Sequence, residues 1–145
     1  MQNTQINTGL QEFRFTDNSG KVFASFFMNP GDLNVAKRFD DAARFFEKNR
    51  GKKMNLVEFT AYSRVLEKKV AAAIGCKRDD IFGKVPAATV LPDGEFFVAK
   101  VLKVVSDAVR AETARRRKAR MDAVNKYAGQ YDSDPAAGLA PGQKP

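Results

Sequence analysis

Alternating apolar and polar residues near the amino end predict a β-hairpin. Phe13 and Phe15 lie two residues apart, which places both rings on one face of a strand. A second apolar segment, residues 22–27, follows the turn sequence Asp-Asn-Ser-Gly, in which Gly20 can take the positive φ that closes a tight turn. Strict alternation puts Phe23, Ser25 and Phe27 on one face of this strand and Val22, Ala24 and Phe26 on the other. The second strand should therefore be apolar on both faces and pack against helices or a partner.

Two helices are predicted next, because apolar residues recur at three- and four-residue steps. The first spans about residues 33–49 with Asp32 as its N-cap, and Gly51 is placed to end it. The second begins after Asn55, a cap residue with an acid three positions on, and Gly75 ends it. The stripes expected to be buried are Val35, Ala36, Phe39, Ala42, Ala43 and Phe46 in the first helix, and Leu56, Phe59, Leu66, Val70, Ala73 and Ile74 in the second.

A long last helix follows a linking segment with room for one helical turn around residues 80–82 and a turn at Pro-Asp-Gly, residues 92–94. The helix begins near Glu95 and runs to about residue 128. Its apolar stripe is Phe97, Val101, Val104, Val105 and Ala108, and the same face continues as Ala111, Arg115 and Lys118. The stripe returns weakly at Met121, Val124 and Ala128. At 1.5 Å per residue this helix is roughly 50 Å long, so it should extend beyond the core.

These elements predict a mainly α, α+β fold: an N-terminal hairpin followed by three helices, the last of them long. A single domain over residues 11–128 should lie between a flexible segment, residues 1–10, and a disordered tail rich in Pro, Gly and Ala, residues 129–145.

Composition excludes several classes of function. The 145 residues contain no histidine and one cysteine, Cys76, which removes zinc sites built from Cys and His and any internal disulfide. No apolar run is long enough for a membrane span, and the first residues lack the pattern of a signal peptide. We therefore expect a cytoplasmic protein with no membrane contact, no cofactor, no metal and no enzymatic activity.

The candidate catalytic groups all have simpler structural interpretations. Neither Asp40-Asp41 nor Asp79-Asp80 converges on one substrate, since adjacent helical residues point about 100° apart. We interpret the first pair as helix surface and the second as a helix-start cap. Cys76 lies beside Lys77 and Arg78, which can lower a thiol pKa, but no histidine is present to act as its base. It is interpreted as a passive residue. Gly83-Lys84 lacks the rest of a phosphate-binding loop.

A basic run from residue 110 to residue 126 carries seven Lys and Arg against two acidic residues, within a net charge of +8. Such a run can neutralise phosphates, but its cations point all round a helix, as on a solvated extension or an arm for an acidic protein partner. Both interpretations stay open at this point. The candidate polyanion or acidic-partner patch is Arg115, Arg116, Arg117, Lys118 and Arg120.

The hairpin phenylalanines form a second candidate site. They could stack nucleic-acid bases, but such platforms interleave aromatic and basic residues, and here only Arg14 and Lys21 are near. Core packing or subunit contact is the favoured interpretation. The residues proposed for oligomer or client contact are Phe13, Phe15, Phe23, Phe26, Phe27 and Phe82.

Two strings carry a family resemblance: FRFTDNSGKVFASFFMNPGDLNVAKRFDDA, which leads into the first long helix, and IFGKVPAATVLPDGEFFVAKVLKVV, which leads into the last. This layout over residues 12–110 resembles small proteins from the tail-gene clusters of long-tailed phages and prophages of Gram-positive bacteria, identified as tail assembly chaperones. The resemblance implies a non-enzymatic, oligomeric protein that coats the tape-measure protein until tail-tube subunits polymerise around it. It implies residence in the cytoplasm of the bacterial host. It does not account for the basic helix and tail beyond residue 110.

Two alternatives from other classes remain at the level of the sequence. One is a structural virion protein, such as a connector or tail component. The other is a small basic protein that binds nucleic acid through the basic run.

Overall fold

The computed structural model describes residues 1–132, with side chains as far as Gly129. It confirms the predicted fold class: an antiparallel hairpin followed by helices, the last of them long. The elements are β1 (Gln11–Thr16), β2 (Val22–Met28), α1 (Leu33–Asn49), α2 (Leu56–Ile74), the one-turn α3 (Arg78–Phe82) and α4 (Phe97–Asp132). The disordered tail predicted from the sequence lies outside the described residues from position 133 onward.

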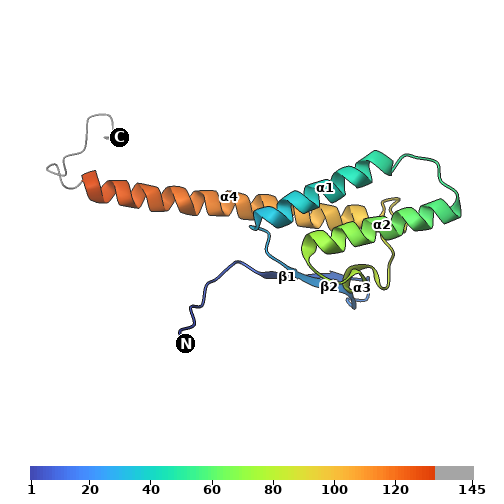
Figure 1. The fold of residues 1–145 in the computed structure, drawn as a ribbon, viewed down its shortest axis with the longest axis horizontal. Coiled ribbons are helices and arrows are strands. Elements are labelled where there is room, and N and C mark those ends of the chain that lie inside the picture. Colours follow the sequence, from blue (N-terminus) through green and yellow to red (C-terminus); the bar gives the residue numbers. More distant parts are fainter. Residues whose placement is uncertain (133–145) are drawn as a thin grey trace.

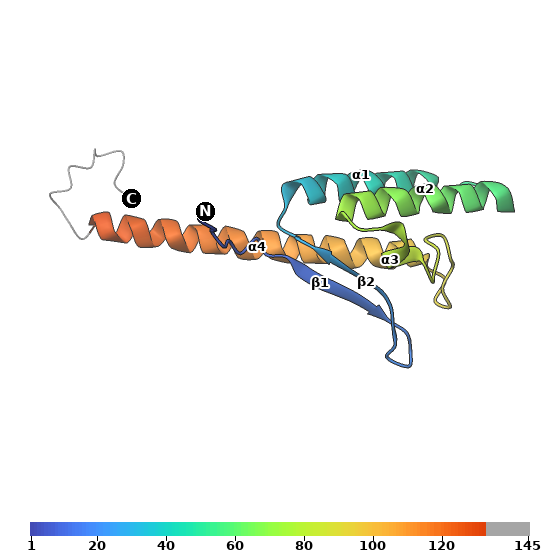
Figure 2. The same cartoon turned by 60° about the horizontal axis from the view of Figure 1, so that its bottom comes forward.

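The body of the protein has three parts stacked around the first half of α4. Helices α1 and α2 form an antiparallel pair on one side of α4, and the hairpin crosses it on the other side (Figures 1 and 2). Aromatic contacts join these parts. The ring of Phe46 in α1 lies 5.8 Å, between centroids, from that of Phe96, the residue before α4. The ring centroid of Phe97, the first residue of α4, lies 5.8 Å from that of Phe15 and 5.6 Å from that of Phe23 in the hairpin. The core therefore lies where hairpin, helix pair and α4 meet.

A β-bulge changes which side chains of β2 face the core. Phe13 pairs with Phe26, but the register shifts after Phe15, so that Phe15 pairs with Ala24 and Thr16 with Val22. The extra residue in β2 is Phe23, and its ring turns inward to Phe97. The prediction that Phe23 lies on the same face as Ser25 and Phe27 is therefore wrong. The outer face of β2 carries Ser25 and Phe27, opposite Arg14 and Glu12 of β1.

The caps of α1 and α2 are largely those predicted. Asp32 accepts a hydrogen bond from the Asn34 amide, and Asn55 accepts one from Glu58. Gly75 ends α2 in the left-handed conformation, with φ +88°. Helix α1 ends at Asn49 and its C-cap is Arg50, in a right-handed conformation, so that Gly51 does not end the helix as predicted.

The buried face of α2 contains four of the predicted residues, Leu66, Val70, Ala73 and Ile74, and is wider than predicted. Ser63 and Glu67 are also buried, because a loop after α3 packs on this side of the helix, as described below. Leu56, the first residue of the helix, was predicted to be buried but is 80% exposed. The complete buried set of α2 is Tyr62, Ser63, Leu66, Glu67, Val70, Ala71, Ala73 and Ile74.

Helix α4 leaves the body part-way along its length. Its buried residues are Phe97, Val98, Val101, Leu102, Val105 and Glu112. The core-facing side of α4 thus runs through Glu112, not through Ala111, Arg115 and Lys118, and Val104, at 39% exposed, lies off it. Residues 113–132 then project from the body (Figures 1 and 2), over about 30 Å at 1.5 Å per residue. We call this segment the α4 extension. The helix ends at Asp132, past the predicted end at residue 128.

Candidate protein-binding surfaces

The six phenylalanines proposed for contact, five in the hairpin and Phe82 in α3, divide between core and surface. Phe26 and Phe82 are each 3% exposed and belong to the core, whereas Phe27 is 58% exposed. The remaining three, Phe13, Phe15 and Phe23, are partly buried and pack against the core cluster. Of the six phenylalanines proposed for contact, Phe27 is therefore the one that the folded monomer offers to another molecule.

Phe27 borders a groove of about 650 Å³. The groove is lined by three consecutive residues of β2 and none of β1, together with residues 75–77 and Asp80 from the corner between α2 and α3. It therefore lies along the side of β2 away from β1. Two large apolar side chains line the groove, the buried Phe26 and the exposed Phe27.

A buried carboxylate, Glu112, pairs with two of the cations in the basic run. Glu112 is 6% exposed, on the side of α4 that faces the body. Its two oxygens are 2.9 Å from the Arg115 and Arg116 guanidinium groups. Two of the five cations proposed as a patch are thus paired with an acid of the same helix. The sequence signal was the spacing, with Glu112 three and four residues before the two arginines.

Arg116 also fixes the amino-terminal segment to α4. Its Nη2 donates to the Thr8 carbonyl oxygen over 3.1 Å and to Asn29 Oδ1 over 3.2 Å. Asn29 in turn donates to the same carbonyl. A Cβ atom at Gly9 or Gly31 would overlap the guanidinium group, so both positions need glycine for this approach. Arg116 is therefore a structural residue at the point where the α4 extension leaves the body.

The other three cations of the patch are available to a partner. Arg117, Lys118 and Arg120 are exposed, and no carboxylate of residues 1–129 lies within ion-pair distance of any of them. The α4 extension also carries exposed apolar side chains, with Met121 at 54% and Val124 at 51%. This segment therefore combines unpaired positive charge with apolar surface.

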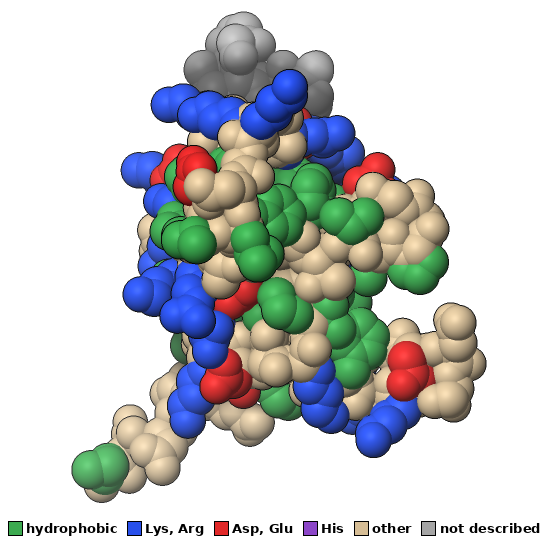
Figure 3. Space-filling view, turned by 90° about the vertical axis from the view of Figure 1, so that its right-hand side faces the viewer, with side chains coloured by type: hydrophobic (Ala, Val, Ile, Leu, Met, Phe, Trp, Pro, Cys, Tyr) green, Lys and Arg blue, Asp and Glu red, His purple; other side chains and the backbone are tan. Residues whose placement is uncertain are grey.

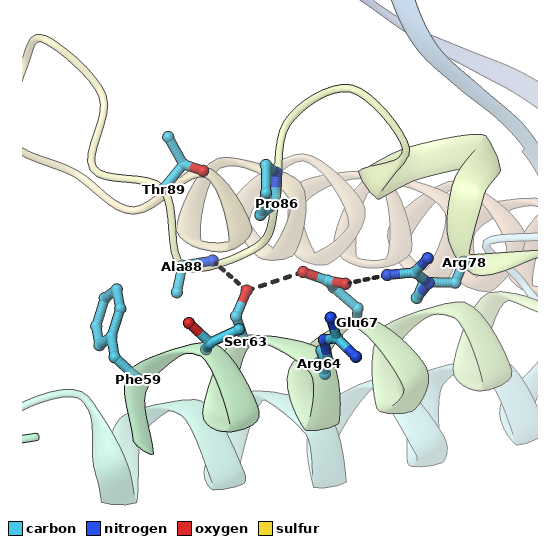
Figure 4. Close-up of a pocket in the computed structure, with 9 residues that line it drawn as sticks. Phe59, Ser63, Arg64, Glu67, Arg78, Pro86, Ala88 and Thr89 are labelled. Atoms are coloured by element: carbon cyan, nitrogen blue, oxygen red, sulfur yellow. Dashed lines mark hydrogen bonds and ion pairs between the residues drawn. The ribbon is translucent and has the colours of Figure 1, made fainter. Parts of the chain in front are cut away.

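A polar pocket lies between α2 and the loop that follows α3 (Figure 4). Glu67, 2% exposed, accepts from Ser63 Oγ over 2.8 Å, from Arg78 Nη1 over 2.9 Å and from the Ala87 amide over 3.1 Å. Ser63 accepts in turn from the Ala88 amide over 3.1 Å. The hydrogen bond to Glu67 raises the pKa of Arg78. The side chains of Ser63, Glu67 and Arg78 are thus all hydrogen-bonded to groups of this chain.

This network attaches the loop to α2 and to the start of α4. While the amides of Ala87 and Ala88 bond to α2, the carbonyls of Ala87 and Thr89 accept from the first amides of α4, Val98 and Phe97, over 2.9 and 2.8 Å. The polar groups of the pocket thus have a structural role, because they hold α2, the loop and α4 together. The sequence analysis missed it, although Ser63 and Glu67, one helical turn apart among apolar residues, are the signal for a buried polar pair.

The acidic pairs have the structural roles predicted for them. Asp40 forms an ion pair with Arg44 on the exposed face of α1, with 3.0 Å between Oδ2 and Nε. Asp80 accepts from the Lys77 amide over 3.1 Å at the start of α3. Neither pair forms a shared carboxylate site.

The Cys76 thiol should react slowly at neutral pH. Burial, followed by the charge of Asp80, raises its pKa from 9.0 to about 11. A raised pKa means less thiolate, so at pH 8 iodoacetamide should alkylate the folded protein about a hundredfold more slowly than a thiol of pKa 9.0. The rate should rise about tenfold per pH unit up to about pH 11. Mass spectrometry of timed samples measures this, with urea-unfolded protein as control. A rate that levels off below pH 9 would contradict the assignment.

A further apolar surface lies at the far end of the body from the α4 extension. Leu56 and Val57, at 80% and 78% exposed, border a groove of about 410 Å³ with Thr60, Ala61 and Arg64. Figure 3 looks at this end of the molecule and shows hydrophobic side chains gathered between basic ones.

In residues 1–132 no group of three or more Cys, His, Asp or Glu is placed to hold a metal ion. Nor does that part of the chain contain a helix of the length and apolarity needed to cross a membrane. No protein-family model, curated protein or solved structure matches this chain.

Proposed function

We propose that this protein is a tail assembly chaperone of a long-tailed phage or prophage, which binds the tape-measure protein, tail-tube subunits or both during tail morphogenesis. The layout of the sequence over residues 12–110 suggests this role. The observation that carries the proposal is the α4 extension, because it projects from the body and presents exposed apolar and basic side chains, among them Met121, Val124 and Arg117, on one helix. A helix of this kind is suited to holding another helical protein.

The body supplies further contact surface for such a client. Phe27 beside its groove and the exposed Leu56 and Val57 are apolar groups that a folded monomer leaves in water. They lie on different elements, β2 and α2, so that one molecule can contact more than one neighbour. This supports a homo-oligomer or a coat of several copies along an extended client.

Co-expression with the tape-measure protein of the same gene cluster tests the proposal. The two proteins should co-purify, and the chaperone should be absent from purified virions by mass spectrometry. A structural virion protein would instead persist in the finished particle. Absence of co-purification, together with normal tails made without this protein, would refute the proposed function.

The nucleic-acid alternative rests on Arg117, Lys118, Arg120 and the other cations of the α4 extension. It requires binding to duplex or single-stranded DNA that weakens steeply with salt. The pairing of Arg115 and Arg116 with Glu112 reduces the charge free to meet phosphates. This favours a protein client over a polyanion.

A further inference from the structure

The α4 extension carries its own apolar stripe, separate from the face that packs on the body. Ala114, Arg117, Met121, Val124 and Ala128 are spaced by three and four residues in alternation, which is the seam spacing of a coiled coil. At 100° per residue the centre of this stripe lies roughly 140° round the helix from Glu112 and Arg116. The stripe is therefore not a continuation of the core and faces away from it.

The charges beside the stripe restrict what can pack on it. Lys118 and Arg120 lie on its two flanks, and Arg117 occupies a seam position. Over residues 113–129 the extension has six basic residues and one acidic residue, Asp122. A second copy would bring like charges together, with Arg117 facing Arg117 in a parallel pair. The arrangement suits a partner with carboxylates at those positions.

From this charge complementarity we propose that the α4 extension binds an acidic amphipathic helix, which packs its apolar face on Met121 and Val124 and places carboxylates beside Arg117, Lys118 and Arg120. The inference rests on the proposed function in one respect, that the helix belongs to the client. Arg115 and Arg116 take no part, because Glu112 and the Thr8 carbonyl already hold them.

A synthetic peptide tests the proposal on the full-length protein. The probe is a three-heptad helical peptide with Ile and Leu in the seam and Glu at the flanking positions. Its control has the same seam with Lys at the flanks. By isothermal titration calorimetry at low salt, the Glu peptide should bind at least tenfold more tightly than the Lys peptide, and added salt should weaken it.

Two pairs of substitutions locate the binding face. Met121→Gln with Val124→Gln removes the apolar surface but keeps good helix formers, so the helix content by circular dichroism should not change while the Glu peptide binds at least tenfold more weakly. Ala119→Gln with Ala123→Gln makes the same kind of change on the opposite side of the extension and should leave the Kd within twofold.

Charge substitutions separate the two classes of arginine. Arg117→Gln with Arg120→Gln should weaken binding about tenfold, whereas Arg116→Gln should leave it unchanged. The proposal is overturned if both peptides bind equally, if neither binds while duplex DNA does, or if sedimentation shows a dimer that Met121→Gln and Val124→Gln dissociate. The last outcome would assign the stripe to a second copy.

The peptide experiment and the client experiment fail independently. Binding of the Glu peptide without co-purification of the tape-measure protein keeps this inference and removes the proposed function. Co-purification that the Met121→Gln and Val124→Gln pair leaves intact keeps the proposed function and removes this inference.

Discussion

Replacing Glu67 by Ala should lower the free energy of unfolding by about 3 kcal/mol, measured by urea denaturation. The carboxylate is 2% exposed and accepts three hydrogen bonds, so its removal leaves the buried Ala87 amide without an acceptor. An unpaired buried donor costs about 1–3 kcal/mol, and the lost bonds to a charged group and the cavity add to it. The loss of the ion pair with Arg78 adds less to this cost, because the Arg78 side chain is 46% exposed and water can solvate its charge in the variant.

Two variants show whether this cost belongs to the buried network. Glu67→Gln keeps an acceptor for Ser63 and Ala87 but turns an amide donor toward Arg78, so we expect a loss of about 1 kcal/mol. Arg64→Ala removes an exposed side chain that lines the same pocket, and its effect should stay within about 0.5 kcal/mol. An equal effect of Arg64→Ala and Glu67→Ala would contradict the assignment of Glu67 as the joint between α2, the loop and α4.

Local signals predicted most of the fold. The caps at Asp32 and Asn55, the left-handed Gly20 and Gly75 and the three- and four-residue spacing of apolar side chains are short-range features, and each produced its element. The inward turn of Phe23 could not be predicted in this way. It depends on one extra residue in β2 and on the presence of Phe97, far along the chain, as a neighbour for the ring.

Long-range contacts also explain what the sequence left open about the basic run. Charge counting treats Arg115, Arg116, Arg117, Lys118 and Arg120 as equivalent. Glu112 signals the local pairing of Arg115 and Arg116, but no local rule brings Thr8 and Asn29 to Arg116. That contact joins segments that are about a hundred residues apart and requires the folded body. Once Arg115 and Arg116 are assigned to Glu112, the other three cations, Arg117, Lys118 and Arg120, form one surface with the Met121 stripe.

Long-range contacts also changed the interpretation of the hairpin phenylalanines. In the sequence they are a set of aromatic residues near one turn, which suggested a surface for binding other protein molecules. In the structure most of the hairpin rings pack on Phe97 or on each other, and the exposed ring is Phe27. The exposed apolar side chains that we propose for contact are therefore Phe27, Leu56 and Val57 at the start of α2, and Met121 and Val124 of the α4 extension.

Replacing Phe97 by Ala should lower the free energy of unfolding by about 3–5 kcal/mol, the range for removing a large buried ring. Phe97 is 1% exposed and contacts the rings of Phe15, Phe23 and Phe82, so the truncation opens a cavity where hairpin, α3 and α4 meet. Thermal and urea unfolding measure the effect. Phe97→Leu, expected to lose about 1–2 kcal/mol, provides a folded variant if the alanine substitution does not fold.

Phe27→Ala is the matched control, because it removes the same side chain from a position that is 58% exposed in the monomer. Its cost should stay within about 0.5 kcal/mol, while client binding should fall if Phe27 is a contact residue. Phe97→Leu should do the reverse: it should lower stability and leave binding of the Glu-flanked peptide unchanged, since the α4 extension begins beyond the core. A large, concentration-dependent loss of stability in Phe27→Ala would show instead that this ring is buried between copies of the chain, and that the folded unit in solution is an oligomer.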